Sequence, residues 1–290
     1  MEGVVTNVTI RQANPSDAAE CGRICYEAFA AIAGAHNFPR DVPDVGAAVG
    51  LLSMLLTHEK FYAIVAESAG RIVGSNFLDE RGAIVGLGPI TIDPEIQNQG
   101  IGGALMSAAI EREERRGAAG LRLVQAGYHC RSLSLYSKLG FEVREHLSCV
   151  QGPGLDERMP GYAVRRAVED DLNDCNALAM RVHGHHRGGE LRDAIQQGVA
   201  TVAERAGRIT GYASQVAFFG HAVAETTDDL KALISATPSF EGPGFLVPSR
   251  NGALLRWCLE SGLRIRQPMT LMTRGLYNEP VGAYLCSVLY

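Results

Sequence analysis

The sequence lacks the features that mark several common functional classes. Acidic residues (32) outnumber Lys and Arg (27), which gives a net charge of -5 and a pI near 5.9, so the basic surface typical of nucleic-acid-binding proteins is absent. No apolar run is long enough to span a membrane, and the first residues show no basic stretch followed by an apolar one. We therefore expect no nucleic-acid partner, no membrane segment and no signal peptide.

Paired cysteines are absent too. The seven cysteines are scattered singly, and no Cys-x-x-Cys pair occurs. An odd number of isolated thiols favours a reducing cytoplasm over a disulfide framework or a zinc site. The run His183-Gly184-His185-His186 has no carboxylate or cysteine at ligand spacing. We therefore expect a cytoplasmic protein that binds no metal, and we interpret this run as a polar lip between domains.

What is present indicates a globular protein. A length of 290 residues, with 46% hydrophobic and 20% charged residues, suffices for one large domain or two of ordinary size.

The most informative stretch covers residues 90–103. Alternating Ile90 and Ile92 predict the end of a strand, and Pro94 stops it because proline has no N–H to donate. A polar loop follows, and from Gly100 apolar residues recur every four positions, which predicts a helix. The first N–H groups of a helix have no partner within it, so a phosphate can bind them where glycines leave the backbone open. A tight, glycine-rich turn without a ligand fits the same pattern.

Two motifs carry a family resemblance. Gln97-Asn98-Gln99-Gly100-Ile101-Gly102 fits Gln/Arg-x-x-Gly-x-Gly/Ala, and it resembles the acyl-CoA pyrophosphate signature of the GNAT superfamily of N-acetyltransferases. The Gly-Lys-Ser/Thr of a Walker loop and the Gly-x-Gly-x-x-Gly of a dinucleotide-binding unit are both missing. Downstream, Tyr136-Ser137-Lys138-Leu139-Gly140-Phe141 is similar to the family's Tyr-x-x-x-Gly-Phe.

The expected elements agree with this resemblance. Over residues 6–150 their order is β-α-α-β-β-β-α-β-α-β, which is the element order of the GNAT fold. The resemblance implies an α/β fold with a mixed sheet, whose central strands splay apart to admit acetyl-CoA. Gly86, Gly88 and Pro89 interrupt the strand expected over residues 83–92, which predicts a bulge or a close approach of the backbone to a ligand.

The second half of the chain repeats the first. Residues 65–74 recur as residues 202–211, and residues 10–21 match residues 164–175. We therefore predict two GNAT-like domains in tandem, over residues 1–151 and 162–290, with a linker over residues 152–161. The aromatic, apolar tail over residues 276–290 is expected to dock one domain on the other.

The second copy has lost the glycine loop. In its place stands Glu225-Thr226-Thr227-Asp228-Asp229, whose negative charge would repel a pyrophosphate, although Thr226 or Thr227 can cap the helix. Cys258 takes the position of Tyr136. We interpret residues 162–290 as a degenerate domain that does not bind CoA in the usual way and that walls the substrate cleft.

The resemblance implies a role for each motif of the first copy. Tyr136 would be the acid that protonates the CoA sulfur, and the backbone of Ile90, Thr91 and Ile92 would pair with the pantetheine arm. His129 replaces an asparagine that often contacts the pantetheine, and its ionisation near neutral pH would make this contact pH-dependent. A core tyrosine and a surface histidine are the alternatives. The pyrophosphate would be held by Gln97, Asn98, Gln99, Gly100, Ile101, Gly102 and Gly103.

These features together predict an N-acetyltransferase that transfers an acetyl group from acetyl-CoA to a primary amine by direct attack. We expect a small-molecule acceptor, but a small amine, an amino acid, a polyamine, an aminoglycoside and a protein N-terminus all remain open. The general base is Glu67, Asp79, Glu80, Asp93 or a water. We expect a monomer or a homodimer. An acyl-CoA-binding or sensing protein without turnover is the alternative, and a longer acyl chain is a further option.

Overall fold

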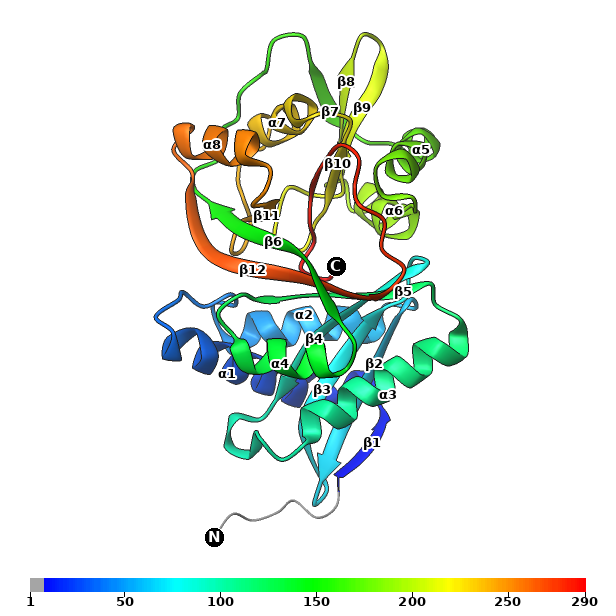
Figure 1. Ribbon diagram of the computed structural model, residues 1–290, viewed down its shortest axis with the longest axis vertical. Coiled ribbons are helices and arrows are strands. Elements are labelled where there is room, and N and C mark those ends of the chain that lie inside the picture. Colours follow the sequence, from blue (N-terminus) through cyan, green and yellow to red (C-terminus); the bar gives the residue numbers. More distant parts are fainter. Residues whose placement is uncertain (1–7) are drawn as a thin grey trace.

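The first half of the chain has the predicted order of elements. The computed structural model describes residues 8–290 (Figure 1), so the start of the chain, on which the signal-peptide expectation rests, lies outside the described residues. The elements of this half are β1 (Val8–Gln12), α1 (Ala18–Ala35), α2 (Val45–Thr57), β2 (Phe61–Ser68), β3 (Arg71–Asp79), β4 (Ile84–Ile92), α3 (Ile101–Arg116), β5 (Gly120–Ala126), α4 (Cys130–Lys138) and β6 (Glu142–Gln151). Short 3-10 turns over Pro15–Asp17 and Pro94–Ile96 precede α1 and α3.

The second half repeats this order and adds one short strand. As in the first half, a short 3-10 turn, here Glu169–Asp171, precedes the first helix. No helix within the described part of the chain is long and apolar enough to cross a membrane. The elements are β7 (Ala163–Arg166), α5 (Leu172–His183), α6 (Gly188–Gln196), β8 (Thr201–Arg205), β9 (Arg208–Ala213), β10 (Ala222–Ala224), α7 (Thr227–Ser235), β11 (Phe245–Pro248), α8 (Gly252–Glu260), β12 (Arg264–Gly275) and β13 (Ala283–Leu285).

An ion-pair triad occurs at the same place in both halves. An arginine of the first strand donates to an aspartate at the start of the following helix and to a glutamate at the end of the next strand. The distances are 2.8 and 2.7 Å in the first half and 2.7 Å for both pairs in the second. The triads are Arg11, Asp17 and Glu67, and Arg165, Asp171 and Glu204. The repeat seen in the sequence is therefore also a repeat of hydrogen bonds.

The sheets do not follow the two halves of the chain. The larger sheet has eight strands in the order β1-β2-β3-β4-β5-β12-β6-β11, so β12 of the second half lies between β5 and β6 of the first. In turn, β6 lies between β12 and β11 (Figure 1). The last long strand of each half thus lies between two strands of the other half. The predicted boundaries at residues 151 and 162 mark where the repeat restarts, but the sheet of the first half continues into the second.

The C-terminal segment of the chain adds a strand, β13, to the smaller sheet. Its order is β13-β10-β9-β8-β7, and β13 pairs antiparallel with β10 over Ala222–Ala224. On its far side the strand reaches β11 through a bridge between Cys286 and Leu246. The tail therefore occupies the gap between the fourth and fifth strands of the second copy.

The helices cover both faces of the larger sheet. Helices α3 and α4 pack on one face through a core that contains Leu105, Met106 and Tyr136. Helices α1 and α2 pack on the other face, around Cys21 and Leu52. The two faces meet different parts of the molecule, because the α1 and α2 face also receives Leu289 from the tail.

The exchanged strand makes the core of the first half dependent on the second. Met272 of β12 is fully buried in the cluster under α3 and α4. We expect Met272→Ala to lower the free energy of unfolding by about 2–5 kcal/mol, the usual cost of such a cavity. Urea unfolding followed by circular dichroism measures this change.

The matched control is Ile265→Ala on the same strand, because Ile265 is 47% exposed. Its effect should be within about 1 kcal/mol. Equal effects of the two substitutions would contradict the role of β12 as a core strand.

Candidate active site

The central strands of the larger sheet splay apart. Strands β4 and β5 pair in parallel only from Ile84 opposite Gly120 to Gly86 opposite Arg122, although β4 continues to Ile92. On the other edge of β4 the pairing with β3 shifts register between Asn76 and Leu78. The predicted bulge is therefore present, and it lies at the point where the two central strands separate. Residues Ile90, Thr91 and Ile92 lie along the open part of β4.

The loop after β4 presents its backbone to solvent. Asn98 and Gly100 have φ angles of +68° and +83°, so the chain turns sharply before α3 begins at Ile101. No side chain caps this helix. Its first N–H groups are therefore not satisfied by a cap from within the chain, which is the arrangement that binds phosphate groups. Asn98, Gln99 and Gly100 are exposed.

The glycines at the start of α3 leave room that the protein itself does not use. A Cβ atom at Gly103 would meet nothing within 4 Å, and one at Gly102 would make ordinary contacts with the side chains of Leu135 at 3.5 Å and Ile92 at 3.8 Å. Packing therefore does not require glycine at either position. Gly100 differs, because its left-handed backbone disfavours any other residue.

Arg131 adds a positive charge to the loop, and the sequence analysis missed it. It is exposed on the first turn of α4 and donates to the side-chain oxygens of Gln97 and Asn98, the latter at 3.2 Å. Gln97 in turn donates through Nε2 to the Ile92 carbonyl at 3.2 Å. A basic residue five positions before Tyr136 was the available signal.

Three polar side chains lie in a row on the inner side of α4. Tyr136 is only 6% exposed, and burial raises its pKa to about 12 while a hydrogen bond from Ser132 opposes that rise. The Ser132 hydroxyl lies 2.8 Å from Nδ1 of His129. Tyr136 therefore stays protonated at neutral pH, as an acid must, and its hydroxyl is linked to the start of the helix.

His129 differs from the expectation for a surface histidine. Burial, together with the charges of Arg131 and His36, lowers its pKa to about 4. The ring is neutral near pH 7, so the expected pH dependence of its contact near neutrality is wrong. Its Nε2 atom is buried and has no partner.

Comparison with known proteins identifies the first half. Residues 58–143 match the family model described as an acetyltransferase (GNAT) domain. Acetyltransferase SG1711 of Sodalis glossinidius is 32% identical over 93 residues, which cover 31% of this chain and 63% of that protein. These matches support a GNAT acetyltransferase domain within the first half of the chain. The match spans less than two thirds of that relative's length.

Solved structures extend the GNAT fold over the whole chain. A candidate acetyltransferase of Pyrococcus horikoshii superposes with a TM-score of 0.76 over 96% of this chain and 93% of its own, at 16% identity. A tandem GNAT protein from the clavulanic acid biosynthesis pathway superposes with a TM-score of 0.56 over 95% of this chain and 99% of its own, at 14% identity. At these identities the likeness shows the fold alone. The predicted mixed α/β fold with two GNAT-like copies is confirmed.

In the second GNAT-like copy, the helix that corresponds to α3 is α7, and side chains cap the N–H groups at its start. Thr226 accepts from the Asp229 N–H at 3.3 Å, and Asp229 accepts from the Thr226 N–H at 2.9 Å. The predicted cap is therefore present. Cys258 is fully buried in the core. Because β13 also fills the gap between the strands, this copy offers neither the open helix end nor the open sheet of the first.

The carboxylates considered as bases are all engaged by arginine. Each has an arginine nitrogen within 3.4 Å. The pairs are Glu67 with Arg11, Asp79 with Arg81, Glu80 with Arg112, and Asp93 with Arg23. These carboxylates beside the central strands thus form ion pairs that belong to the fold.

Another carboxylate lies near the end of β5. Asp41, between α1 and α2, accepts a 2.7 Å hydrogen bond from Nε2 of Gln267 on β12. Burial raises the pKa of Asp41, and the contacts with Gln267 and Arg266 oppose that rise. Burial and the charge of Asp41 raise the pKa of Tyr128, which lies two residues beyond β5. The exchanged strand therefore reaches the loop of the first half.

The histidine run lies in the interface between the halves. His183 and His185 are each 7% exposed, so the interpretation as a polar lip is wrong. Burial, together with nearby arginines, lowers the pKa of His185 to about 3. Within residues 8–290, no three His, Cys, Asp or Glu side chains lie together as a metal site would require.

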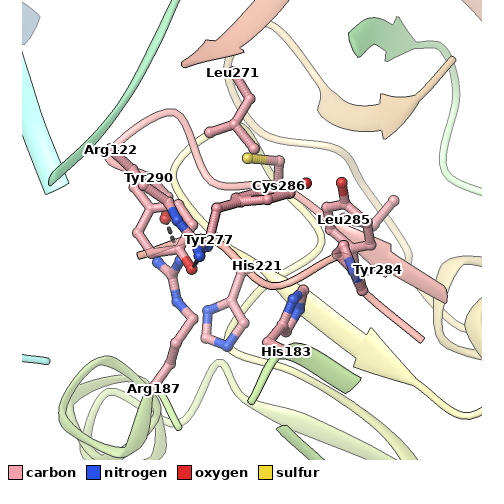
Figure 2. A pocket seen from close by; sticks show the side chains of 11 residues that line it. Arg122, His183, Arg187, His221, Leu271, Tyr277, Tyr284, Leu285, Cys286 and Tyr290 are labelled. Atoms are coloured by element: carbon pink, nitrogen blue, oxygen red, sulfur yellow. Dashed lines mark hydrogen bonds between the residues drawn. The ribbon is translucent and has the colours of Figure 1, made fainter. Parts of the chain in front are cut away.

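The tail anchors this interface. The ring of Tyr290 lies between the guanidinium groups of Arg122 on β5 and Arg187 in the second half, at 4.5 and 4.1 Å from the ring centroid. Its hydroxyl accepts a hydrogen bond from Arg122 (Figure 2). The same hydroxyl lies 2.8 Å from Nε2 of His185. The tail therefore contacts both halves, as the sequence predicted.

The burial of His129 predicts a pH dependence of stability. Its pKa falls from 6.5 to about 4 on folding, so the unfolded chain binds the extra proton between these values. The contribution of the neutral ring is complete above pH 6.5 and is lost as the pH falls towards 4. Wild-type stability should therefore decrease more steeply from pH 7 to pH 5 than that of His129→Asn. Urea midpoints at both pH values measure the difference, and parallel decreases would contradict the buried, neutral ring.

The open start of α3 predicts a defined effect on CoA binding. We expect Gly103→Val to weaken CoA binding at least tenfold, because the added methyl groups fill the space in front of the N–H groups. The melting temperature without ligand should be unchanged or higher, since glycine destabilises a helix. Calorimetric titration with CoA and thermal unfolding measure the two effects. Ala104→Val is the control on the same turn, and an equal loss in that variant would contradict the assignment.

Proposed function

We propose that this GNAT protein transfers an acetyl group from acetyl-CoA to a primary amine of a small molecule. The observation that carries this proposal is the meeting of three features at the open end of the β4 and β5 splay. These are the uncapped start of α3, the unpaired edge of β4 and the buried, protonated Tyr136. Phosphate binding, positioning of an extended arm and protonation of a leaving group are the three tasks of such a transfer.

The cofactor arm would lie along the first half alone. The pyrophosphate would bind the N–H groups of Ile101, Gly102 and Gly103, and Arg131 would add charge at the same loop. The pantetheine would follow the open edge of β4 over Ile90–Ile92, using backbone groups that β5 does not pair. Gln97, Asn98, Gln99 and Gly100 shape the turn, and His129 stands at the start of α4.

The reaction would then need only proton transfers from the protein. The neutral amine attacks the thioester carbonyl carbon, a carbon–nitrogen bond forms, and the carbon–sulfur bond breaks. The departing thiolate takes the proton of the Tyr136 hydroxyl, and the phenolate then regains a proton from water, with Ser132 and His129 as the relay. The amine releases one proton, to a water or to Asp41, whose raised pKa makes it a better acceptor than an ordinary carboxylate.

A small acceptor follows from the way the second half covers the first. On the α1 and α2 face, Leu289 packs into the core and its carbonyl lies against Gly86 of β4. Gln267 and Arg266 of β12 hold the loop that contains Asp41. These contacts hold parts of the second half beside the splay, which favours a small amine over a folded protein as the acceptor.

Removal of the acid tests the mechanism. We expect Tyr136→Phe to lower kcat about 10²–10⁴-fold, the usual contribution of an acid, while the Kd for acetyl-CoA stays within twofold. Thiol release from acetyl-CoA with a panel of amines gives the rate, and calorimetry gives the affinity. Ser137→Ala, an exposed hydroxyl on the same helix, should leave both unchanged.

The same assay separates transfer from mere binding. Binding of acetyl-CoA by the wild-type protein without thiol release for any amine would overturn the transferase proposal and support a sensing role. A comparison of acetyl-CoA with longer acyl-CoA substrates in that assay tests the acetyl preference.

A further inference from the structure

Gln125 is a buried polar side chain with no partner. It is 6% exposed, and neither its Nε2 nor its Oε1 atom makes a hydrogen bond. It lies in β5, three residues beyond the last pair that β5 forms with β4. On its other side β5 pairs with β12, where Thr270 stands opposite. The unpaired amide is therefore at the open end of the splay.

The side chain of Gln125 lies on the face that carries the proposed acid. Side chains alternate along a strand, so Gln125 shares its face with Leu121 and Leu123. Both leucines pack in the same cluster as Tyr136. His129, which follows β5, carries another buried nitrogen without a partner. Two unsatisfied polar groups thus flank the end of this strand.

An unsatisfied buried amide is costly, which argues for a ligand. Each buried donor or acceptor without a partner keeps the full desolvation penalty, and a primary amide has two N–H groups and a carbonyl. A second amide complements it, because each then donates to the carbonyl of the other. A phosphate would not, since the amide carbonyl would face its negative charge.

We propose that Gln125 is a positioning residue that pairs with an amide of the pantetheine arm of acyl-CoA. This inference rests on the proposed function, because it needs acyl-CoA in the splay. The pantetheine arm carries two secondary amides between the pyrophosphate and the sulfur. A partner on β5 would fix the arm from the side opposite to β4, so that the thioester stays next to Tyr136.

The test compares two ligands that differ only in this arm. In Gln125→Leu the Kd for CoA should rise about tenfold or more, while the Kd for 3'-phospho-ADP, which lacks the pantetheine, should stay within twofold. The melting temperature of the ligand-free variant should be unchanged or higher, because an unpaired amide is replaced by an apolar side chain. Gln196→Leu, an exposed glutamine on α6, is the control and should change neither affinity.

The outcomes separate this inference from the proposed function. If the wild-type protein binds neither ligand, the cofactor assignment is wrong and the inference is wrong with it. If wild type and Gln125→Leu bind CoA equally, the inference alone is overturned. A lower melting temperature with equal losses for both ligands would show a purely structural role and would also overturn it.

Discussion

The antiparallel pairing of β6 with β12 is the interaction on which the rest of the molecule depends. It runs from Arg264 opposite Gln151 to Thr273 opposite Glu142, and it joins strands from the two halves of the chain. The strands on either side, β5 and β11, are equivalent in the repeat, so this pair lies on an approximate twofold axis. Neither half has a complete sheet without it. The second copy, although it has lost the features of an acyl-CoA site, is therefore needed for the first.

This exchange also shapes the candidate site. Beyond Arg122, β5 no longer pairs with β4, so that β12 is the strand that pairs with it there. The same strand sends Gln267 to Asp41 on the opposite face. A strand from the other copy thus contacts both faces of the splay, the one on which we propose that the cofactor binds and the one from which we propose that the acceptor approaches. A rigid strand is a better support for such a site than a loop would be.

Local features could be predicted from the sequence, and distant pairings could not. The bulge near Gly88, the cap at Thr226 and the helix start at Gly100 follow from residues next to one another, so the sequence predicts them. The strands that pair with β12 cannot be predicted in this way, because a strand with its pattern of buried residues would fit into any half-covered sheet. The burial of His129 and the contacts of Arg131 depend on how α4 packs, and Gln125 looks like an ordinary strand residue. The unpaired atoms that make it notable exist only in the folded chain.

The position of β12 in the chain also constrains when the protein can fold during synthesis. Domains commonly fold in order as they leave the ribosome, the N-terminal one first. Here the sheet that holds the candidate site lacks an inner strand until residue 275 has been made, since Ala126 pairs with Met269. Until then β5 and β6 each expose an unpaired edge, the kind of surface that invites pairing with other chains. Nascent chains of this protein would therefore carry an open sheet from the synthesis of β5 until β12 has been made.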